Sequence, residues 1–176
     1  LWGGLSIASI AGELVTAATN TAMYTYEIAP IATLIESTIL KRMAELADFG
    51  TSQGTLTTGG SNGNLLGMLC ARQAKIPLSS HSGFDGTKMV AFVSEETHYS
   101  FSIASNVIGI GHSNLITVRC NDDGQMLPEA LDEEIQRALA NDKIPFVVLA
   151  TSGTTVRGSF DPLREISAVA HKYNLW

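Results

Sequence analysis

The sequence predicts an α/β fold in which helices flank a mainly parallel sheet. Strand and helix signals alternate along most of the chain, and the strand candidates are short apolar runs such as 89–94 and 145–150. Unbroken apolar runs are typical of strands that are buried on both faces, as in parallel sheets covered by helices. The alternation therefore indicates right-handed βαβ units with helices on both faces of the sheet.

The N-terminal segment, 1–50, predicts helices without strands. A helix is expected around 7–16. Apolar side chains then recur at helical spacing from Ile31 to Leu46, and Pro30 stands in the first turn, where proline is tolerated. We therefore expect one long helix, which ends in a polar loop over 48–54.

Residues 51–176 carry the alternating signals. A short strand is expected over 54–58, and a helix over 62–73 follows it. The inward residues of that helix should be the apolar ones at helical spacing, namely Leu65, Leu66, Leu69 and Cys70. Valine and phenylalanine enrichment predicts the next strand over 89–94, and the helix after it, over 99–107, should end at Gly109.

The last third of the sequence repeats this order. A strand over 115–120 precedes a turn over 121–124. Pro128 opens an amphipathic helix over 128–140, whose acidic residues come early and whose Arg137 comes late, as the helix dipole favours. A buried strand over 145–150 follows, and we expect Asp161 and Pro162 to cap a final helix over 163–173.

Composition excludes some classes of function. The chain has 176 residues, a net charge of −6 and 45% hydrophobic residues, which is ordinary for a soluble globular protein. Its eleven basic residues are scattered, which argues against a nucleic-acid partner. No apolar run approaches the roughly 20 residues that cross a bilayer, so no membrane role is expected. The first residues also lack the basic start of a signal peptide.

Two cysteines, Cys70 and Cys120, lie in apolar stretches. We expect buried free thiols rather than a disulfide, which favours a cytoplasmic location. The sequence has no initiator methionine and stops at Trp176 just as an apolar segment begins. We therefore expect a fragment of a longer protein.

Two strand-to-helix turns are built from small and hydroxyl residues, at 57–62 and 150–155. Ligands bind at the carboxyl ends of parallel strands, so both turns should lie near a site. Glycines allow close approach of the backbone, and free N–H groups at a helix start attract anions such as a phosphate ester. The alternative is that Ser61 is merely a helix cap. Neither turn is a P-loop or a G-x-G-x-x-G motif.

His98 follows the strand over 89–94 and should lie at the same edge of the sheet. A flat imidazole there could stack on an aromatic cofactor ring, although a surface or capping histidine is the alternative. The neighbouring Glu95 and Glu96 are expected to be solvated. A metal site is not supported, because the histidines are far apart in the sequence and form no metal-binding pair. They are His81, His98, His112 and His171.

The stretch 50–54 matches the G-x-S-x-G nucleophile elbow. That motif requires a strand before the serine and a helix after it. Here the predicted order is the reverse, so Ser52 is not expected to be a nucleophile.

Four segments together resemble a known family. They are Thr25-Tyr26-Glu27-Ile28-Ala29-Pro30, Thr58-Gly59-Gly60-Ser61-Asn62-Gly63-Asn64, Glu96-Thr97-His98-Tyr99-Ser100, and Ala150-Thr151-Ser152-Gly153-Thr154-Thr155 running on to Asp161-Pro162. Their order and spacing resemble the pyridoxal-phosphate-dependent group II amino-acid decarboxylases, which act on glutamate, cysteine sulfinate, diaminobutyrate or aromatic amino acids. Residues 51–176 would then be part of the large domain of a fold-type I enzyme.

The resemblance implies roles for individual residues. Gly60 and Ser61 would bind the phosphate of pyridoxal 5′-phosphate, and His98 would stack on its ring and assist catalysis. Thr155 would lie near the polar edge of the ring. Tyr24 would be a substrate-pocket residue that reaches the neighbouring subunit, since the family forms homodimers.

One residue departs from the family pattern, because Asn62 replaces an acidic residue that is common after the serine. The resemblance also implies an aspartate that pairs with the pyridine nitrogen and a lysine that forms the Schiff base. Both would come in later segments, and neither is present in this sequence. We therefore expect decarboxylation of a glutamate-like or diaminobutyrate-like L-amino acid by the full-length parent rather than by these residues alone. The alternatives are another fold-type I enzyme (a lyase or aminotransferase), a non-catalytic binding fragment, or an α/β nucleotide-binding module.

Overall fold

The computed structural model describes residues 3–50, 54–86 and 88–176. They form two compact units that divide after Leu56, whereas the sequence placed the boundary after residue 50. Each unit is described by itself. The G-x-S-x-G serine, Ser52, lies outside the described residues.

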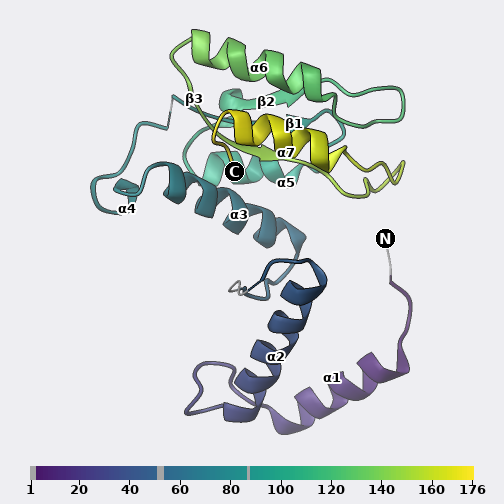
Figure 1. Cartoon of the computed structure of the whole chain (residues 1–176). Helices are drawn as coiled ribbons and strands as arrows, with labels where there is room; N and C mark the ends of the chain where they lie inside the picture. The colour runs from purple at the N-terminus through teal and green to yellow at the C-terminus, as the bar shows by residue number, and fades with distance from the viewer. Residues whose placement is uncertain (1–2, 51–53, 87) are drawn as a thin grey trace. The chain divides into compact units, whose positions relative to one another are not determined.

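The first unit contains α1 (Ile7–Thr19) and α2 (Pro30–Leu46), drawn in purple and blue in Figure 1. Pro30 begins α2 as expected. Helix α1 is longer than expected and continues to Thr19. The hydroxyls of Thr16 and Thr19 donate to carbonyls one turn earlier, each at 3.0 Å. It ends at Asn20, whose backbone is left-handed with φ 43°. Among the described residues of this unit, Ala29 is the one apolar residue that is buried.

The second unit is built on three parallel strands, β1 (Met89–Ser94), β2 (Leu115–Val118) and β3 (Ile144–Leu149), in the order β2-β1-β3. This arrangement confirms the predicted fold class. The helices and the one 3₁₀ turn of this unit lie between and after the strands. They are α3 (Gly60–Lys75), α4 (Ser79–Ser82), α5 (Ser100–Val107), η1 (His112–Asn114), α6 (Pro128–Ala140) and α7 (Leu163–Lys172).

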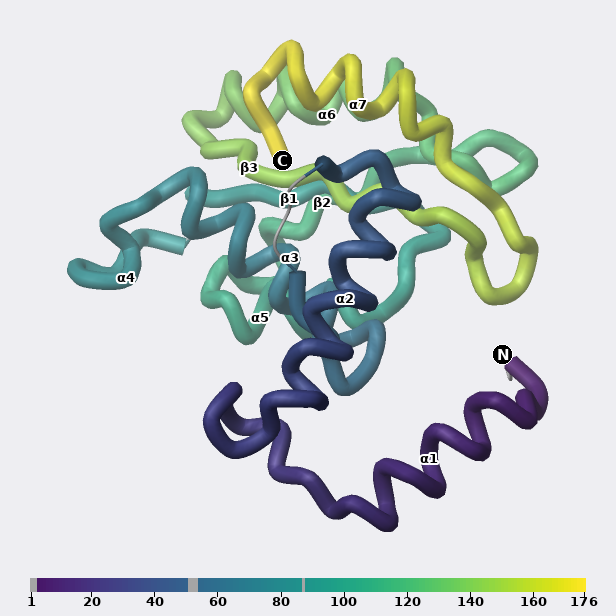
Figure 2. The backbone as a smooth tube through the Cα atoms, turned by 60° about the horizontal axis from the view of Figure 1, so that its bottom comes forward, coloured from purple at the N-terminus to yellow at the C-terminus, as the bar shows by residue number. Residues whose placement is uncertain are grey.

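The helices form two layers, one on each face of the sheet (Figure 2). Successive side chains of β1 point to opposite faces, so one strand contributes to two cores. On one face, Ala91 and Val93 pack with Phe101 and Ile108 around helices α3 and α5. On the other, Phe92 packs against buried residues of α6 and α7. Every residue of β1 is buried, which explains its unbroken apolar sequence.

Helix α6 shows how the pattern becomes structure. Pro128 begins it, and its buried side chains, Ala130, Leu131, Ile135 and Ala138, lie on one face. Opposite charges sit at its ends, with Glu129 in the first turn and Arg137 in the last, which favours the helix dipole.

The segment 54–58 is not a strand, so this prediction was wrong. The hydroxyl of Thr55 donates to the carbonyl of Leu56 at 3.3 Å, and that of Thr57 donates to the carbonyl of Gly59 at 3.1 Å. These local hydrogen bonds take the place of backbone pairing with a neighbouring strand, and no described strand pairs with the segment.

The prediction for the inward face of α3 was wrong in part. Met68 and Ala71 are its buried residues, Leu65 and Leu69 pack at the edge of the core, and Cys70 is exposed. Cys120 is half-buried, with its sulfur 3.2 Å from the hydroxyl oxygen of Ser94. Both thiols are free, as expected, but neither is fully buried as the sequence suggested.

The last residues lie along β3. The N–H of Trp176 donates to the carbonyl of Phe146 at 3.1 Å, and the N–H of Val148 donates to the carbonyl of Trp176 at 2.7 Å. This alternation is the pairing of a parallel ladder. Trp176 therefore occupies the edge of β3 that β1 leaves open.

Candidate functional site at the carboxyl edge of the sheet

The three parallel strands end at one edge of the sheet. The segments that follow them there are 95–99 after β1, 119–127 after β2 and 150–162 after β3. Polar and small residues collect in these segments, whereas the strands themselves are apolar. This edge is where ligands bind in open parallel sheets.

The start of α3 is an open helix N-terminus. Its N-cap residue is Gly59, and no side chain caps it. Ser61 lies inside the first turn and is exposed, so the interpretation of Ser61 as a helix cap is wrong. The first turn carries no acidic residue, and a Cβ added at Gly59 or Gly60 would meet no atom within 4 Å. An anion can therefore approach these backbone N–H groups closely.

His98 lies in the loop between β1 and α5 and is exposed. Its Nδ1 accepts the backbone N–H of Ser100 at 3.2 Å and lies 2.8 Å from the Ser100 hydroxyl oxygen. The imidazole centroid is 4.3 Å from that of Tyr99, and the two rings are tilted by 33°. The ring is thus held at one nitrogen while much of it remains accessible.

Asn64 connects α3 to His98. Its side-chain amide donates to the Ser100 hydroxyl at 2.8 Å, so Ser100 bridges the first turns of α3 to the imidazole. A hollow of about 260 Å³ lies between α3 and α5, and Ser61 and Ser100 both line it. The structure therefore brings the Gly60–Ser61 turn and His98 to the same side of the molecule.

The loop after β3 is fastened by Asp161. This residue is 4% exposed, and its carboxylate accepts the N–H groups of Met126 at 2.7 Å and Thr151 at 2.6 Å. It does not cap α7, as the sequence suggested, because the N-cap residue is Pro162 and no side chain caps that helix. Within the loop, Thr154 is buried and Thr155 is exposed.

The two acidic residues before His98, which were expected to be solvated, both contact neighbouring segments. Glu95 is exposed, yet its carboxylate accepts the N–H of Cys120 at 2.8 Å. Glu96 is half-buried and forms an ion pair with Arg157 at 3.8 Å. Both contacts join neighbouring segments of the carboxyl edge.

Tyr24, the predicted substrate residue, belongs to the first unit and is 82% exposed. The site residues that sequence reasoning missed are Asn64, Ser100 and Asp161. Asn64 and Ser100 are each part of a segment that resembled the family, but their contact joins residues 36 positions apart and has no local signature. Among the described residues, no cluster of histidine, cysteine, aspartate or glutamate is suited to a metal ion, and no helix is long and apolar enough to cross a membrane.

Comparison with known proteins now assigns the family. The family described as "Pyridoxal-dependent decarboxylase conserved domain" matches residues 1–176. The chain belongs to the pyridoxal-dependent decarboxylase family. The sequence-based resemblance is thereby confirmed.

Similar decarboxylases cover the whole chain. The acidic amino acid decarboxylase GADL1 of Xenopus tropicalis is 40% identical over 100% of the chain and 35% of its own length, and that of Mus musculus is 39% identical over 100% and 32%. The chain thus spans about a third of the length of the curated relatives it matches.

Solved structures of decarboxylases have the same fold. The crystal structure of mouse CSAD in apo form has a TM-score of 0.95 at 37% identity, covering 98% of this chain and 37% of that one. Oryza sativa TDC with PLP and tryptamine has a TM-score of 0.87 at 27% identity, covering 97% and 37%.

Proposed function

We propose that the whole protein is a pyridoxal-phosphate-dependent carboxy-lyase that removes the α-carboxylate of an L-amino acid as CO₂. The observation that carries the proposal is the link from the first turns of α3 through Asn64 and Ser100 to His98, at the carboxyl edge of the sheet. It places an anion-binding turn and a flat imidazole on one side of the molecule. Family membership supports the same conclusion.

The described residues fit pyridoxal phosphate in two respects. The uncapped start of α3, with open space at Gly59 and Gly60, suits a phosphate ester. Beside His98, the hydroxyl oxygen of Thr97 is buried and has no hydrogen-bond partner among the described residues. A buried hydroxyl without a partner is costly, so a further polar group at this point would stabilise the site.

In the proposed reaction, Gly60 and Ser61 hold the phosphate, and His98 packs on the cofactor ring. Thr155, exposed in the loop after β3, would contact the polar edge of the ring. When bound, the cofactor would supply an electron sink for the bonding pair that stays at Cα as CO₂ leaves. The residues of this chain contribute orientation, because a fixed ring plane lets the scissile bond stand perpendicular to it.

The substrate proposed is an amino acid with an acidic side chain, as glutamate has. The 40% identity to a protein named acidic amino acid decarboxylase supports this choice. CO₂ release by the purified whole protein with pyridoxal phosphate would be measured on glutamate, aspartate, cysteine sulfinate, diaminobutyrate and tryptophan. Release from the acidic substrates supports the proposal, whereas transamination or elimination without CO₂ contradicts it.

The role of His98 can be tested with a matched control. His98→Ala should lower kcat by about 100-fold or more, because the ring plane is no longer fixed. His112→Ala is the control, since its Nδ1 also lies beside a serine hydroxyl, that of Ser102 at 2.7 Å, but His112 belongs to η1 and not to the loop between β1 and α5. Unchanged kcat in His98→Ala would remove His98 from the site.

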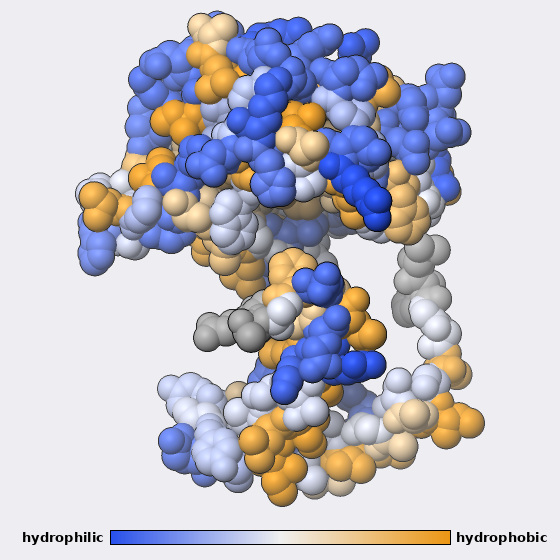
Figure 3. Space-filling model, viewed as in Figure 1, coloured by the Kyte–Doolittle hydropathy of each residue, from blue (hydrophilic) through white to orange (hydrophobic). Residues whose placement is uncertain are grey.

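We also propose that the protein is a homodimer in which the first unit covers a second copy. Large apolar side chains of α1 and α2, and Leu5 shortly before α1, are exposed, with Leu5 at 94% and Ile7 at 88%. Figure 3 shows apolar residues on both helices, interrupted on α2 by hydrophilic ones. Soluble proteins rarely leave such patches uncovered. Tyr24 lies in the same unit and would reach the partner's site.

Sedimentation equilibrium of the whole protein tests this proposal. The paired substitution Leu34→Glu and Ile35→Glu places charge on the exposed face of α2 and should convert dimer to monomer. Glu36→Gln is the control, because it removes a charge from the same turn. A whole protein that is monomeric before substitution would show that another segment of the protein covers this face.

A further inference from the structure

We propose that Asn64 and Ser100 are positioning residues that hold the imidazole of His98 in the tautomer protonated at Nε2. The inference deepens the proposed function and rests on it in one respect, namely that His98 faces the cofactor. The tautomer itself follows from hydrogen bonds alone.

The first step concerns the backbone of Ser100. Its N–H points at Nδ1 of His98 at 3.2 Å. A backbone amide can only donate, so Nδ1 must present its lone pair. In a neutral imidazole the proton then resides on Nε2.

The second step concerns the Ser100 side chain. Its hydroxyl oxygen lies 2.8 Å from Nδ1 of His98 and 2.8 Å from Nδ2 of Asn64. The hydroxyl has one proton, and Nδ1, which has none, receives it. The serine oxygen then accepts from the Asn64 amide, which fixes the orientation of that amide as well, because its carbonyl oxygen would need the same proton.

The third step is burial. Ser100 is 2% exposed and Asn64 is half-buried, so water does not readily replace either bond. The buried Ser100 hydroxyl uses both its proton and its oxygen in this chain, so reorientation would leave one of its two partners without this bond. The chain therefore runs in one direction, from the Asn64 amide through the Ser100 hydroxyl to Nδ1 of His98.

The consequence is chemical. A ring protonated at Nε2 presents an N–H there, which can donate to a carboxylate or another acceptor. The opposite tautomer would present a lone pair at Nε2 and repel the same group. Because Asn64 and the anion-binding Ser61 belong to the same helix, the orientation of His98 is tied to the turn proposed to hold the phosphate.

Asn64→Asp tests the direction of the chain without changing its shape. A carboxylate can only accept, so the Ser100 proton should turn toward it. Nδ1 of His98 then keeps the Ser100 backbone N–H as its single donor, which weakens the preference for the Nε2–H tautomer. The ¹⁵N chemical shifts of labelled histidines in the whole protein report the tautomer, and His98→Gln assigns the His98 signals. We expect an Nε2–H signature before the substitution and a smaller population of that tautomer after it.

Asn106→Asp is the matched control, because it makes the same change at an exposed position near the end of α5. It should leave the His98 tautomer unchanged. A His98 protonated at Nδ1 in the unsubstituted protein, or shifts that do not respond to Asn64→Asp, would overturn the inference whether or not the protein is a decarboxylase.

Kinetics of the whole protein with cofactor test the consequence. Asn64→Asp and Ser100→Ala should lower kcat on the order of 10- to 100-fold, as misplacement of a catalytic group does, with little change in KM. Ser100→Thr retains a hydroxyl and should restore most of the rate. Ser102→Ala, which acts on His112, is the control. A weakened tautomer preference with unchanged kcat would overturn the positioning role. Unchanged kcat in His98→Ala would instead remove His98 from the site, and only a failure to release CO₂ would overturn the proposed function.

Discussion

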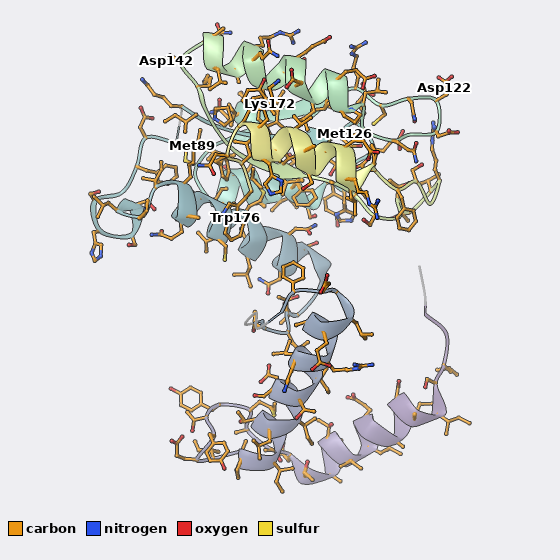
Figure 4. All side chains as sticks on the ribbon, viewed as in Figure 1. Met89, Asp122, Met126, Asp142, Lys172 and Trp176 are labelled. Atoms are coloured by element: carbon orange, nitrogen blue, oxygen red, sulfur yellow. The ribbon has the colours of Figure 1, made fainter. Side chains whose placement is uncertain are left out.

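The carboxylate of Asp161 accepts the backbone N–H of Thr151 at 2.6 Å, across the base of the loop that follows β3. Its other oxygen accepts the N–H of Met126 at 2.7 Å. One buried side chain thus fixes two loops of the carboxyl edge, and Figure 4 shows Met126 close to the start of α7.

Replacement of Asp161 should destabilise the protein. Asp161→Ala leaves two backbone N–H groups without their acceptor in a buried place, which should cost about 2–4 kcal/mol of unfolding free energy. Urea denaturation measures the change. Asp122→Asn is the control, because Asp122 is exposed at the outer loop labelled in Figure 4 and should change stability by less than about 0.5 kcal/mol. Equal effects of the two substitutions would contradict the role of Asp161.

Gly86 is required by close approach of the backbone. A Cβ at this position would lie 1.9 Å from the carbonyl oxygen of Gly109, so the backbone must move at one of the two glycines. Gly86→Ala should therefore lower the thermal unfolding midpoint, with a cost of about 1–3 kcal/mol. Gly67→Ala is the opposite case, since Gly67 is an exposed position in α3 with no atom within 4 Å of a new Cβ. It should raise stability by up to about 1 kcal/mol.

Arg72 joins α3 to the end of α5. One guanidinium nitrogen donates to the carbonyl of Ile108 at 2.8 Å, and the guanidinium carbon lies 4.7 Å from the centroid of the Phe84 ring. Arg72→Lys keeps the charge but loses the planar contact, and should cost about 1–2 kcal/mol in denaturation experiments. Arg137→Lys, on the exposed side of α6, should be close to neutral. A neutral Arg72→Lys would show that charge alone suffices.

Substitution of Ser61 by aspartate should stabilise α3 but weaken the binding of the cofactor phosphate, and this pair of effects tests the phosphate site. Ser61→Asp places a carboxylate in the first turn of α3, where the helix dipole favours it by about 0.3–1 kcal/mol. The same charge repels a phosphate ester, so the affinity of the whole protein for pyridoxal phosphate should fall at least 10-fold. Fluorescence titration with the cofactor measures the loss. Ser61→Ala, which adds no charge, should weaken binding less, and equal effects would argue against a phosphate at this turn.

Asp132 of α6 predicts how stability depends on pH. A 2.7 Å hydrogen bond from Lys172 of α7 is the main reason that the pKa of Asp132 lies below its ordinary value of 3.8. Because the folded state lowers this pKa, the stabilisation is complete above pH 3.8 and is lost as the pH falls through the lowered value.

The matched variants are Asp132→Asn and Lys172→Met. The stability difference between each variant and the unsubstituted protein should be constant near neutral pH and should shrink at acidic pH below 3.8. Guanidinium denaturation at several pH values measures it. A difference that grows on acidification would contradict the sign of the pKa shift.

Periodicity and turn chemistry determined much of the fold. The apolar run of β1 and the proline-started helices α2 and α6 were predicted nearly to the residue, because their signals are local. The segment 54–58 was misassigned for the same reason. Alternating threonines favour a strand, but a strand exists only where a neighbour pairs with it, and the threonine hydroxyls bond to local carbonyls instead.

The sequence by itself also determined the family resemblance and pointed to Gly60, Ser61 and His98. Only the tertiary structure decided that Asn64 contacts Ser100, and that Asp161 binds two loops rather than capping α7. Those contacts join residues 10, 35 or 36 positions apart and depend on the packing of α3 against α5 and of the loops at the carboxyl edge. Such packing is set by the whole core, and therefore no local pattern of residues encodes it.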